Sequence, residues 1–433
     1  MSISNSASET TSVLSAGNQN SQLTGPLKPK RSLKPIAAFF IISVLIYMEL
    51  IGGRSFFDEA LSIVSVLYLL FLAIRDELSR YDSVSLFILM VVIFIGLASN
   101  VFSGISRPLT SVLIDVVAET KVLWAFFAAK YMFRGQTGKT FATALVFLAK
   151  AYIISAFVCS IVSQVVNIGM TESQRYGLQG FRFVFPFSFQ FMAVSLLAIA
   201  ILIKGNAKNR KVYYVLASIS LMLATKSAPL LFGLLFLVLL YYFNHFKKLN
   251  AFVVALLFLG VIFVGSYQIQ TYLMNVNAPR YLFFLHGAEL ANRFFPLGAG
   301  FSTFGSDQAA RLYSPLYYEF GFSYLFGLNP EDGSFLSDTF WPMAIGQFGW
   351  IAFALLVILY LRIVLGFKGP VKHEFESKAF LYAAFLSYMI HAVGSAILSS
   401  SAGVIGFIAL GLVCSSYDDQ LIGSKRLGRV GGI

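Results

Sequence analysis

The sequence predicts an all-α polytopic membrane protein, on three observations: its composition, the length of its apolar runs and the placement of its cations. Hydrophobic residues make up 58% of the 433 residues and charged residues only 12%. A soluble domain carries about 25% charged residues. The apolar residues come in runs of roughly 15 to 25, the length that crosses a bilayer. Because backbone groups in lipid must be satisfied within each segment, these runs are expected to be helices.

About twelve such runs are predicted to span the membrane, and they fall within one transmembrane domain over residues 35–417. The predicted spans are 36–51, 59–74, 84–102, 112–133, 141–167, 184–203, 212–225, 229–243, 251–270, 339–362, 379–398 and 402–416. Residues 1–34 are polar and end in a basic cluster, which indicates a disordered cytoplasmic N-terminus. Residues 418–433 are expected to form a cytoplasmic tail. The short seventh and eighth spans could form one hairpin broken at 226–229.

The cations test this arrangement. Segments predicted to be cytoplasmic hold 22 Lys and Arg, and segments predicted to be outside hold 8. This bias places both termini in the cytoplasm and segment 271–337, between spans nine and ten, on the outer side. It also accounts for the net charge of +12 without a nucleic-acid partner.

The outer cations are seven Arg and one Lys. Topology requires only positive charge, whereas a planar fork that holds phosphate or carboxylate requires Arg. This preference favours an outward anion site, although some of these Arg could be structural partners for outer acids.

Segment 271–337 is too long to be a simple connection, and such loops usually have a function. It holds three arginines, Arg280, Arg293 and Arg311, and sixteen Phe or Tyr among its 67 residues. A glycine-rich turn between aromatic residues lies at 295–304. Glu289 and Arg293 have the i,i+4 spacing of a helix ion pair.

Two outer carboxylates are candidate general bases. Glu319 lies in an aromatic stretch, Leu316–Gly321, where its pKa could rise, although a structural hydrogen bond is the simpler explanation. Asp338 begins the tenth span, where an ordinary N-cap is the alternative. Three further cations could hold a phosphate: Arg175 and Arg182, for which lipid-headgroup contact is the alternative, and Lys226, which could also snorkel.

The fourth span contains ionisable residues. Asp115 and Glu119 lie four residues apart and share one helix face. A charge at the bilayer centre costs at least ~2.5 kcal/mol, so both are expected to face the bundle or a wet cavity, with Lys150 as a possible partner. A buried ion pair and a functional role both stay open. The four His and two Cys form no ligand set, so no metal and no cofactor are expected.

At these residues the chain resembles the bacterial O-antigen polymerase and ligase superfamily, the Wzy/WaaL-like proteins. The shared pattern is Arg280, then the turn Pro296–Phe304 resembling "P-x-G-x-G-x-x-x-F", then Asp338 opening a span that reaches Gly349. Residues 224–228 resemble the family's "T-x-S-R-G" hairpin. Ligases of this family carry a His where Asp338 stands. The absence of this His favours a polymerase over a ligase. Among the polymerases, the chain resembles the xanthan-type exopolysaccharide polymerases. The paired RX10G motifs of some polymerases are missing.

The resemblance implies a GT-C-like glycosyltransferase in the bacterial inner membrane. It would join repeat units carried on undecaprenyl pyrophosphate at the periplasmic face, beside a flippase, a chain-length regulator and membrane lipid. Arg280 would stabilise the leaving pyrophosphate, and Asp338 or Glu319 would take the proton of the acceptor hydroxyl. The supporting cations would be Arg175, Arg182, Lys226, Arg293 and Arg311.

Three alternatives stay open: an O-antigen-type ligase, a secondary transporter and a non-enzymatic scaffold of polysaccharide assembly. Transporters of this size often show two similar halves with a site at the midplane. This chain shows no matching halves, and its long loop comes late in the sequence.

Overall fold

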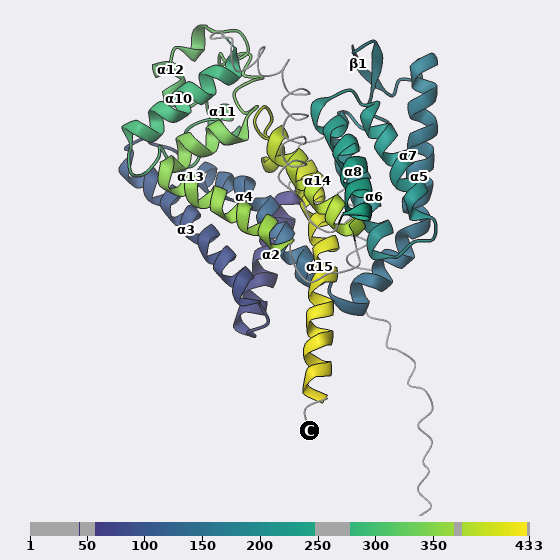
Figure 1. Ribbon diagram of the computed structural model, residues 1–433. Helices are drawn as coiled ribbons and strands as arrows, with labels where there is room; N and C mark the ends of the chain where they lie inside the picture. Colours follow the sequence, from purple (N-terminus) through teal and green to yellow (C-terminus); the bar gives the residue numbers. More distant parts are fainter. Residues whose placement is uncertain (1–42, 44–56, 247–277, 368–374, 431–433) are drawn as a thin grey trace, which may run out of the picture. The chain divides into compact units, whose positions relative to one another are not determined.

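The computed structural model describes residue 43 and residues 57–246, 278–367 and 375–430, with side chains to residue 415 (Figure 1). The predicted spans 36–51 and 251–270 lie outside the described residues, as does the predicted N-terminal segment 1–34. Every other predicted span coincides with a helix, with ends shifted by several residues.

The described part is mostly helical, as predicted. The long helices are α2 (Phe57–Ile74), α3 (Arg80–Phe102), α4 (Leu109–Met132), α5 (Gly135–Val165), α6 (Ser188–Lys204), α7 (Arg210–Met222), α8 (Ser227–His245), α13 (Phe340–Gly366), α14 (Phe375–His391) and α15 (Ser401–Val430). Among the described residues, five helices are long and apolar enough to cross a membrane: α2, α3, α5, α8 and α13. The chain is therefore a multi-pass helical membrane protein.

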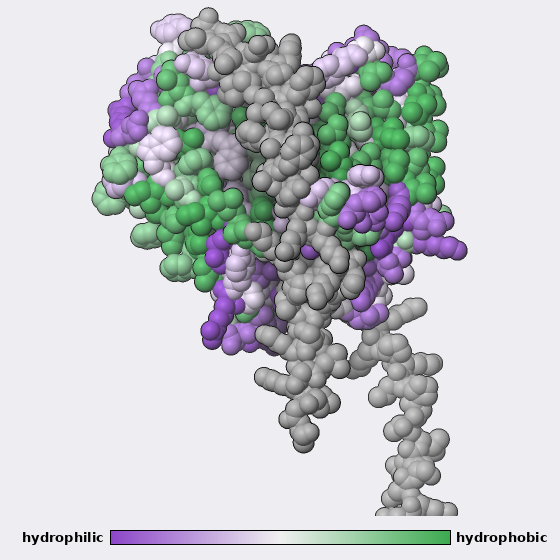
Figure 2. Space-filling model, viewed as in Figure 1, coloured by the Kyte–Doolittle hydropathy of each residue, from purple (hydrophilic) through white to green (hydrophobic). Residues whose placement is uncertain are grey.

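Helices α4, α6 and α15 form the interior of the described part. Helix α15 packs against both α4 and α6, while α2 covers α4, α13 packs on α3, and α14 packs on α8. Helices α3 and α5 turn large apolar side chains outward, among them Phe94 at 71% and Phe147 at 78% exposure. Figure 2 shows hydrophobic surface over α3 and α13 and over α5 and α7. Such a surface suits contact with lipid.

Two differences from the prediction concern the ends of spans. Helix α15 continues to Val430, through the segment expected to be a tail. Before α6, strands β1 (Thr171–Arg175) and β2 (Leu178–Phe181) form an antiparallel hairpin that the sequence analysis missed. Its turn residues Tyr176 and Gly177 have φ of 54° and 77°. Positive φ at both positions is typical of the two-residue hairpin turn whose twist matches its strands.

The predicted outer loop is an ordered helical region. It contains α10 (Pro279–Arg293), α11 (Asp307–Arg311), α12 (Pro315–Glu319) and a short 3-10 turn, Phe322–Tyr324. Its aromatic residues form a separate apolar cluster that includes Phe283, Phe304 and Tyr317. The aromatic richness of this segment therefore builds its own core.

The glycine-rich turn 295–304 enters the helical bundle. The Ala299 and Gly300 amides donate to the carbonyls of Gly346 and Gln347 in α13, both at 2.9 Å. On the other side, the Asn100 side chain of α3 donates to the carbonyl of Phe301 and accepts from its amide, both at 2.8 Å. The turn is thus bonded to two long helices.

Helix α13 is broken where it meets this turn. Gly349 has φ 72° and ψ 175°, inside an otherwise regular helix. This backbone region is essentially restricted to glycine. A Cβ at Gly349 would lie 2.1 Å from the carbonyl oxygen of Leu297, so the close approach of the two segments also requires glycine. The Asp338-to-Gly349 spacing noted in the sequence therefore corresponds to the segment of α13 that precedes its break.

Polar contacts far from this turn join segments that were all predicted to be cytoplasmic. Asp82, at the start of α3, pairs with Lys130 near the end of α4 at 2.8 Å. Near the end of α13, Arg362 donates to Ser85 at 3.1 Å. These contacts agree with the predicted grouping of segments on one side.

Candidate functional site

A cavity of about 200 Å³ collects residues from five separate segments that were predicted to lie on the outer side or beside it. We call it the Arg280 cavity. The charged or titratable residues that line it are Glu172, Arg175, Lys226, Arg280, Asp338 and His391. Four of the eight residues predicted to form the site, Arg175, Lys226, Arg280 and Asp338, are therefore brought together.

Arg280 and Asp338 form the central pair of this cavity. Arg280 stands in the first turn of α10, directly after Pro279, and its Nη2 lies 2.8 Å from Oδ2 of Asp338. The backbone of Gly394 comes close, since a Cβ there would be 3.5 Å from Cζ of Arg280. Burial raises the pKa of Asp338, and the Arg280 guanidinium opposes that rise. A carboxyl that retains proton affinity suits a general base.

The second ion pair of the cavity joins the β hairpin to the tip between α7 and α8. Lys226 Nζ lies 2.9 Å from Oε2 of Glu172, and Oε1 of Glu172 accepts the Ser188 amide at 2.7 Å. Arg175 has no ion-pair partner among the described residues. Its charge is uncompensated, so the three cations outnumber the two carboxylates, and the cavity can attract an anion.

His391 also lines the cavity, and it was not among the residues predicted to form the site. It is the last residue of α14. The indole of Trp341 donates to the carbonyl of Met389 at 3.0 Å, which fixes the end of α14 beside the start of α13. Within the described part of the chain, the buried Nε2 of His391 has no hydrogen-bond partner. The Gly394–Ser395 pair that follows the helix was the available signal that the chain ends its span here.

Arg182, in contrast, does not line the Arg280 cavity. Its guanidinium donates to the backbone carbonyls of Thr171, Phe185 and Gly169, at 3.2, 2.5 and 3.2 Å. These bonds use its donors to hold the β hairpin against the start of α6. The geometry gives no support for the predicted phosphate contact.

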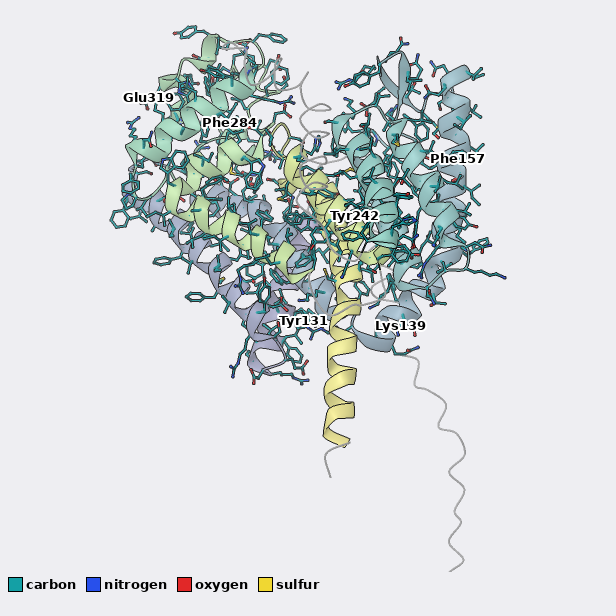
Figure 3. All side chains as sticks on the ribbon, in the orientation of Figure 1. Tyr131, Lys139, Phe157, Tyr242, Phe284 and Glu319 are labelled. Carbon is teal, nitrogen blue, oxygen red and sulfur yellow. The ribbon has the colours of Figure 1, made fainter. Side chains whose placement is uncertain are left out.

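The remaining predicted residues form ion pairs outside the Arg280 cavity. Arg293 pairs with Glu319, with both side chains about half exposed, and Figure 3 labels Glu319 at the outer edge of this region. The expected Glu289–Arg293 pair is wrong, because Glu289 instead contacts His286 at 2.8 Å. Because its side chain is about half exposed, Glu319 is not enclosed by the aromatic residues of the stretch in which it lies.

Arg311 pairs with Asp307 at 2.6 Å and lines a second, larger cavity of about 590 Å³. This second cavity reaches between α2 and α4. There Lys121 lies 2.5 Å from Asp58, and Glu119 accepts a hydrogen bond from Ser399 at 2.5 Å.

Asp115 and Glu119 face the interior, as predicted, and Asp115 accepts the Ser302 amide of the glycine-rich turn at 2.6 Å. Lys150 is not their partner, because its Nζ donates to the carbonyl of Lys208 at 3.0 Å. Lys121, in the same helix, pairs instead with the acids of α2, Asp58 at 2.5 Å and Glu59 at 3.2 Å.

No family model, curated protein or solved structure matches this chain. Among the described residues, no group of three or more His, Cys, Asp or Glu side chains could hold a metal ion.

Proposed function

We propose that this protein is a polysaccharide polymerase of the Wzy kind, with about twelve spans in a GT-C-like arrangement in the bacterial inner membrane. It would join oligosaccharide units carried on undecaprenyl pyrophosphate at the periplasmic face. The observation that carries the proposal is the Arg280 cavity. It brings together three cations, Arg175, Lys226 and Arg280, and two carboxylates, Glu172 and Asp338, on a protein with lipid-facing helices.

The reaction assigns a role to each of these groups. The acceptor hydroxyl attacks the anomeric carbon of the donor glycan, a new glycosidic bond forms, and the bond to the pyrophosphate oxygen breaks. Asp338 takes the proton of the attacking hydroxyl. Negative charge grows on the leaving lipid pyrophosphate, where Arg280 and Arg175 stabilise it as preorganised donors.

Arg280 is already held by Asp338 at 2.8 Å, so it enters the reaction in a fixed position. A side chain positioned in advance stabilises developing charge without reorganisation. Release of the Asp338 proton to water and exchange of the spent lipid carrier would complete a cycle. A flippase that delivers the substrate and a chain-length regulator are the partners that this activity requires.

A pair of substitutions within α10 tests the proposal. Purified protein in lipid vesicles would be given an undecaprenyl-pyrophosphate-linked oligosaccharide, and products would be resolved by gel electrophoresis. Wild type should yield a ladder of polymers, and Arg280→Ala should reduce the rate by about 10²- to 10³-fold. Arg293→Ala, a change of the same residue type in the same helix but outside the cavity, should leave the ladder unchanged. Normal polymer from Arg280→Ala would refute the proposal.

A further inference from the structure

The second cavity shares a wall with the Arg280 cavity, and the wall is the chain segment 337–339. Asp338 lines the Arg280 cavity, while Ser337 and Thr339 line the second cavity. Thr339 has the extended values φ −141° and ψ 131°. In extended backbone, successive side chains point to opposite faces, which explains the alternation. We propose that the second cavity binds an uncharged saccharide.

The lining of this cavity supplies the hydrogen-bonding groups that sugar hydroxyls need. Among the described residues that line it, the carboxyl groups of Asp58, Glu59, Glu119 and Asp307 are accompanied by two cations, Lys121 and Arg311. Hydroxyl side chains complete the lining at Ser306, Ser337, Thr339, Ser399, Ser400 and Ser401. Carboxylates accept hydrogen bonds, and Ser and Thr hydroxyls both donate and accept, so a polyhydroxylated ligand could be satisfied here.

Thr339 gives an independent sign that a ligand is needed. It is the N-cap of α13, yet its side chain makes no capping hydrogen bond. The residue is 1% exposed, and its Oγ1 has no hydrogen-bond partner in the part of the chain that the structure describes. A buried hydroxyl without a partner is unfavourable. A ligand hydroxyl would satisfy it.

Charge and size narrow the class of ligand. A volume of about 590 Å³ lies in the range of small-molecule sites and would hold a short oligosaccharide. The excess of carboxyl groups opposes phosphates and acidic sugars, in contrast to the Arg280 cavity. This difference separates the two cavities by function: one for an anion, the other for neutral hydroxyls.

The identity of the bound sugar as the acceptor end of the growing glycan rests on the proposed function. The two cavities lie on opposite faces of segment 337–339, so a glycan held in the second cavity would have to extend past this segment to bring its acceptor hydroxyl to Asp338, the assigned general base. The saccharide site itself does not depend on that assignment, because its chemistry is that of the second cavity alone.

Ligand binding can be measured without polymerisation. The full-length protein in lipid nanodiscs would be mixed with a panel of short neutral and short acidic oligosaccharides, and complexes would be counted by native mass spectrometry. At least one neutral member should bind, and more tightly than acidic members of its size. Thr339→Val, which keeps the β-branched shape and removes the hydroxyl, should weaken binding about fivefold or more. Thr110→Val, an exposed change of the same type in α4, is the matched control.

Glu119→Gln provides a second variant should Thr339→Val fail to fold, and it should also weaken binding. Arg280→Ala should leave neutral-sugar binding intact, whatever it does to polymer formation. Absence of binding by every neutral member, stronger binding of acidic ones, or binding indifferent to both Thr339→Val and Glu119→Gln would overturn the inference. The proposed polymerase activity is refuted by a different result, a normal polymer ladder from Arg280→Ala.

Discussion

Arg175 differs from the other cations of the Arg280 cavity because it carries no ion pair among the described residues, whereas Lys226 pairs with Glu172 and Arg280 with Asp338. A charged side chain kept without a protein partner contributes little to folding. Its position in strand β1, next to the hairpin turn, fixes where that charge lies. A substitution of Arg175 should therefore affect ligand binding without affecting protein stability.

Arg175→Ala should leave the thermal unfolding midpoint nearly unchanged, within about 0.5 kcal/mol of stability. It should raise the KM for the lipid-linked substrate about tenfold, because a charge-assisted hydrogen bond is lost. Lys226→Ala is the comparison, and it should lower the unfolding midpoint since it leaves Glu172 unpaired. Thermal unfolding and steady-state kinetics measure both effects. A destabilised Arg175→Ala with unaltered KM would remove Arg175 from the site.

Titration of Asp338 should cause the reaction rate to fall at low pH. Its pKa is raised by burial, so its ionised, base form is lost as pH falls through a value above the usual range of an aspartate. Wild-type rates should therefore fall with decreasing pH. Asp338→Asn should reduce the rate by about 10²- to 10⁴-fold and abolish this pH dependence. The same pH–rate profile in both proteins would show that another group titrates.

At the scale of elements, the break in α13 and the glycine-rich turn form one unit. The turn amides bond to Gly346 and Gln347, and the Gln347 side chain donates to the Phe304 carbonyl at 2.9 Å. This unit links the start of α13, where Asp338 stands, to α3 and α4. Precise placement of Asp338 therefore depends on glycine at a position that shares no surface with the cavity.

Gly349→Ala should destabilise the protein by roughly 1–3 kcal/mol or prevent its folding, because alanine cannot adopt this backbone conformation cheaply. Gly366→Ala is the matched control in the same helix. A Cβ at Gly366 would lie 3.6 Å from the nearest heavy atom, an ordinary contact with Tyr81. The unfolding midpoint of the purified protein measures both. Equal stability of the two variants would contradict the role given to Gly349.

At the scale of the whole molecule, the sides of the predicted segments agree with their contacts. The Arg280 cavity joins Arg175, Lys226 and Arg280, all predicted to be outside. The pair Asp82–Lys130 joins segments predicted to be inside. The positive-inside bias and the contacts are independent observations, and both place these segments in the same two groups.

Cysteine labelling tests which group faces outward. In a background without Cys159 and Cys414, Tyr324→Cys should react with a membrane-impermeant maleimide in intact spheroplasts, since Tyr324 is 90% exposed. Lys208→Cys, at an exposed turn of the opposite group, should react only after the membrane is opened. Reversed accessibility would invert the topology.

The spans that the structure describes were predictable because apolar run length is a local pattern. Arg280 and Asp338 were each selected as charged residues beside a span, but their contact with each other was not predicted. The partners of surface charges were not predictable, because Arg293 and Glu319 lie 26 residues apart and meet only after α10 and α12 fold. His391 was missed for a similar reason, since its helix ends seven residues before the predicted span did. The hairpin at Tyr176–Gly177 carried a usable signal, two turn residues between polar strands.

If a lipid-linked diphosphate binds in the Arg280 cavity, an experimental structure with undecaprenyl pyrophosphate bound will show it there. Its phosphate oxygens should lie about 2.7–2.9 Å from the guanidinium nitrogens of Arg280 and Arg175. Diphosphate density at Arg182, at Arg293 or beside Arg311, with the Arg280 cavity empty, would contradict it.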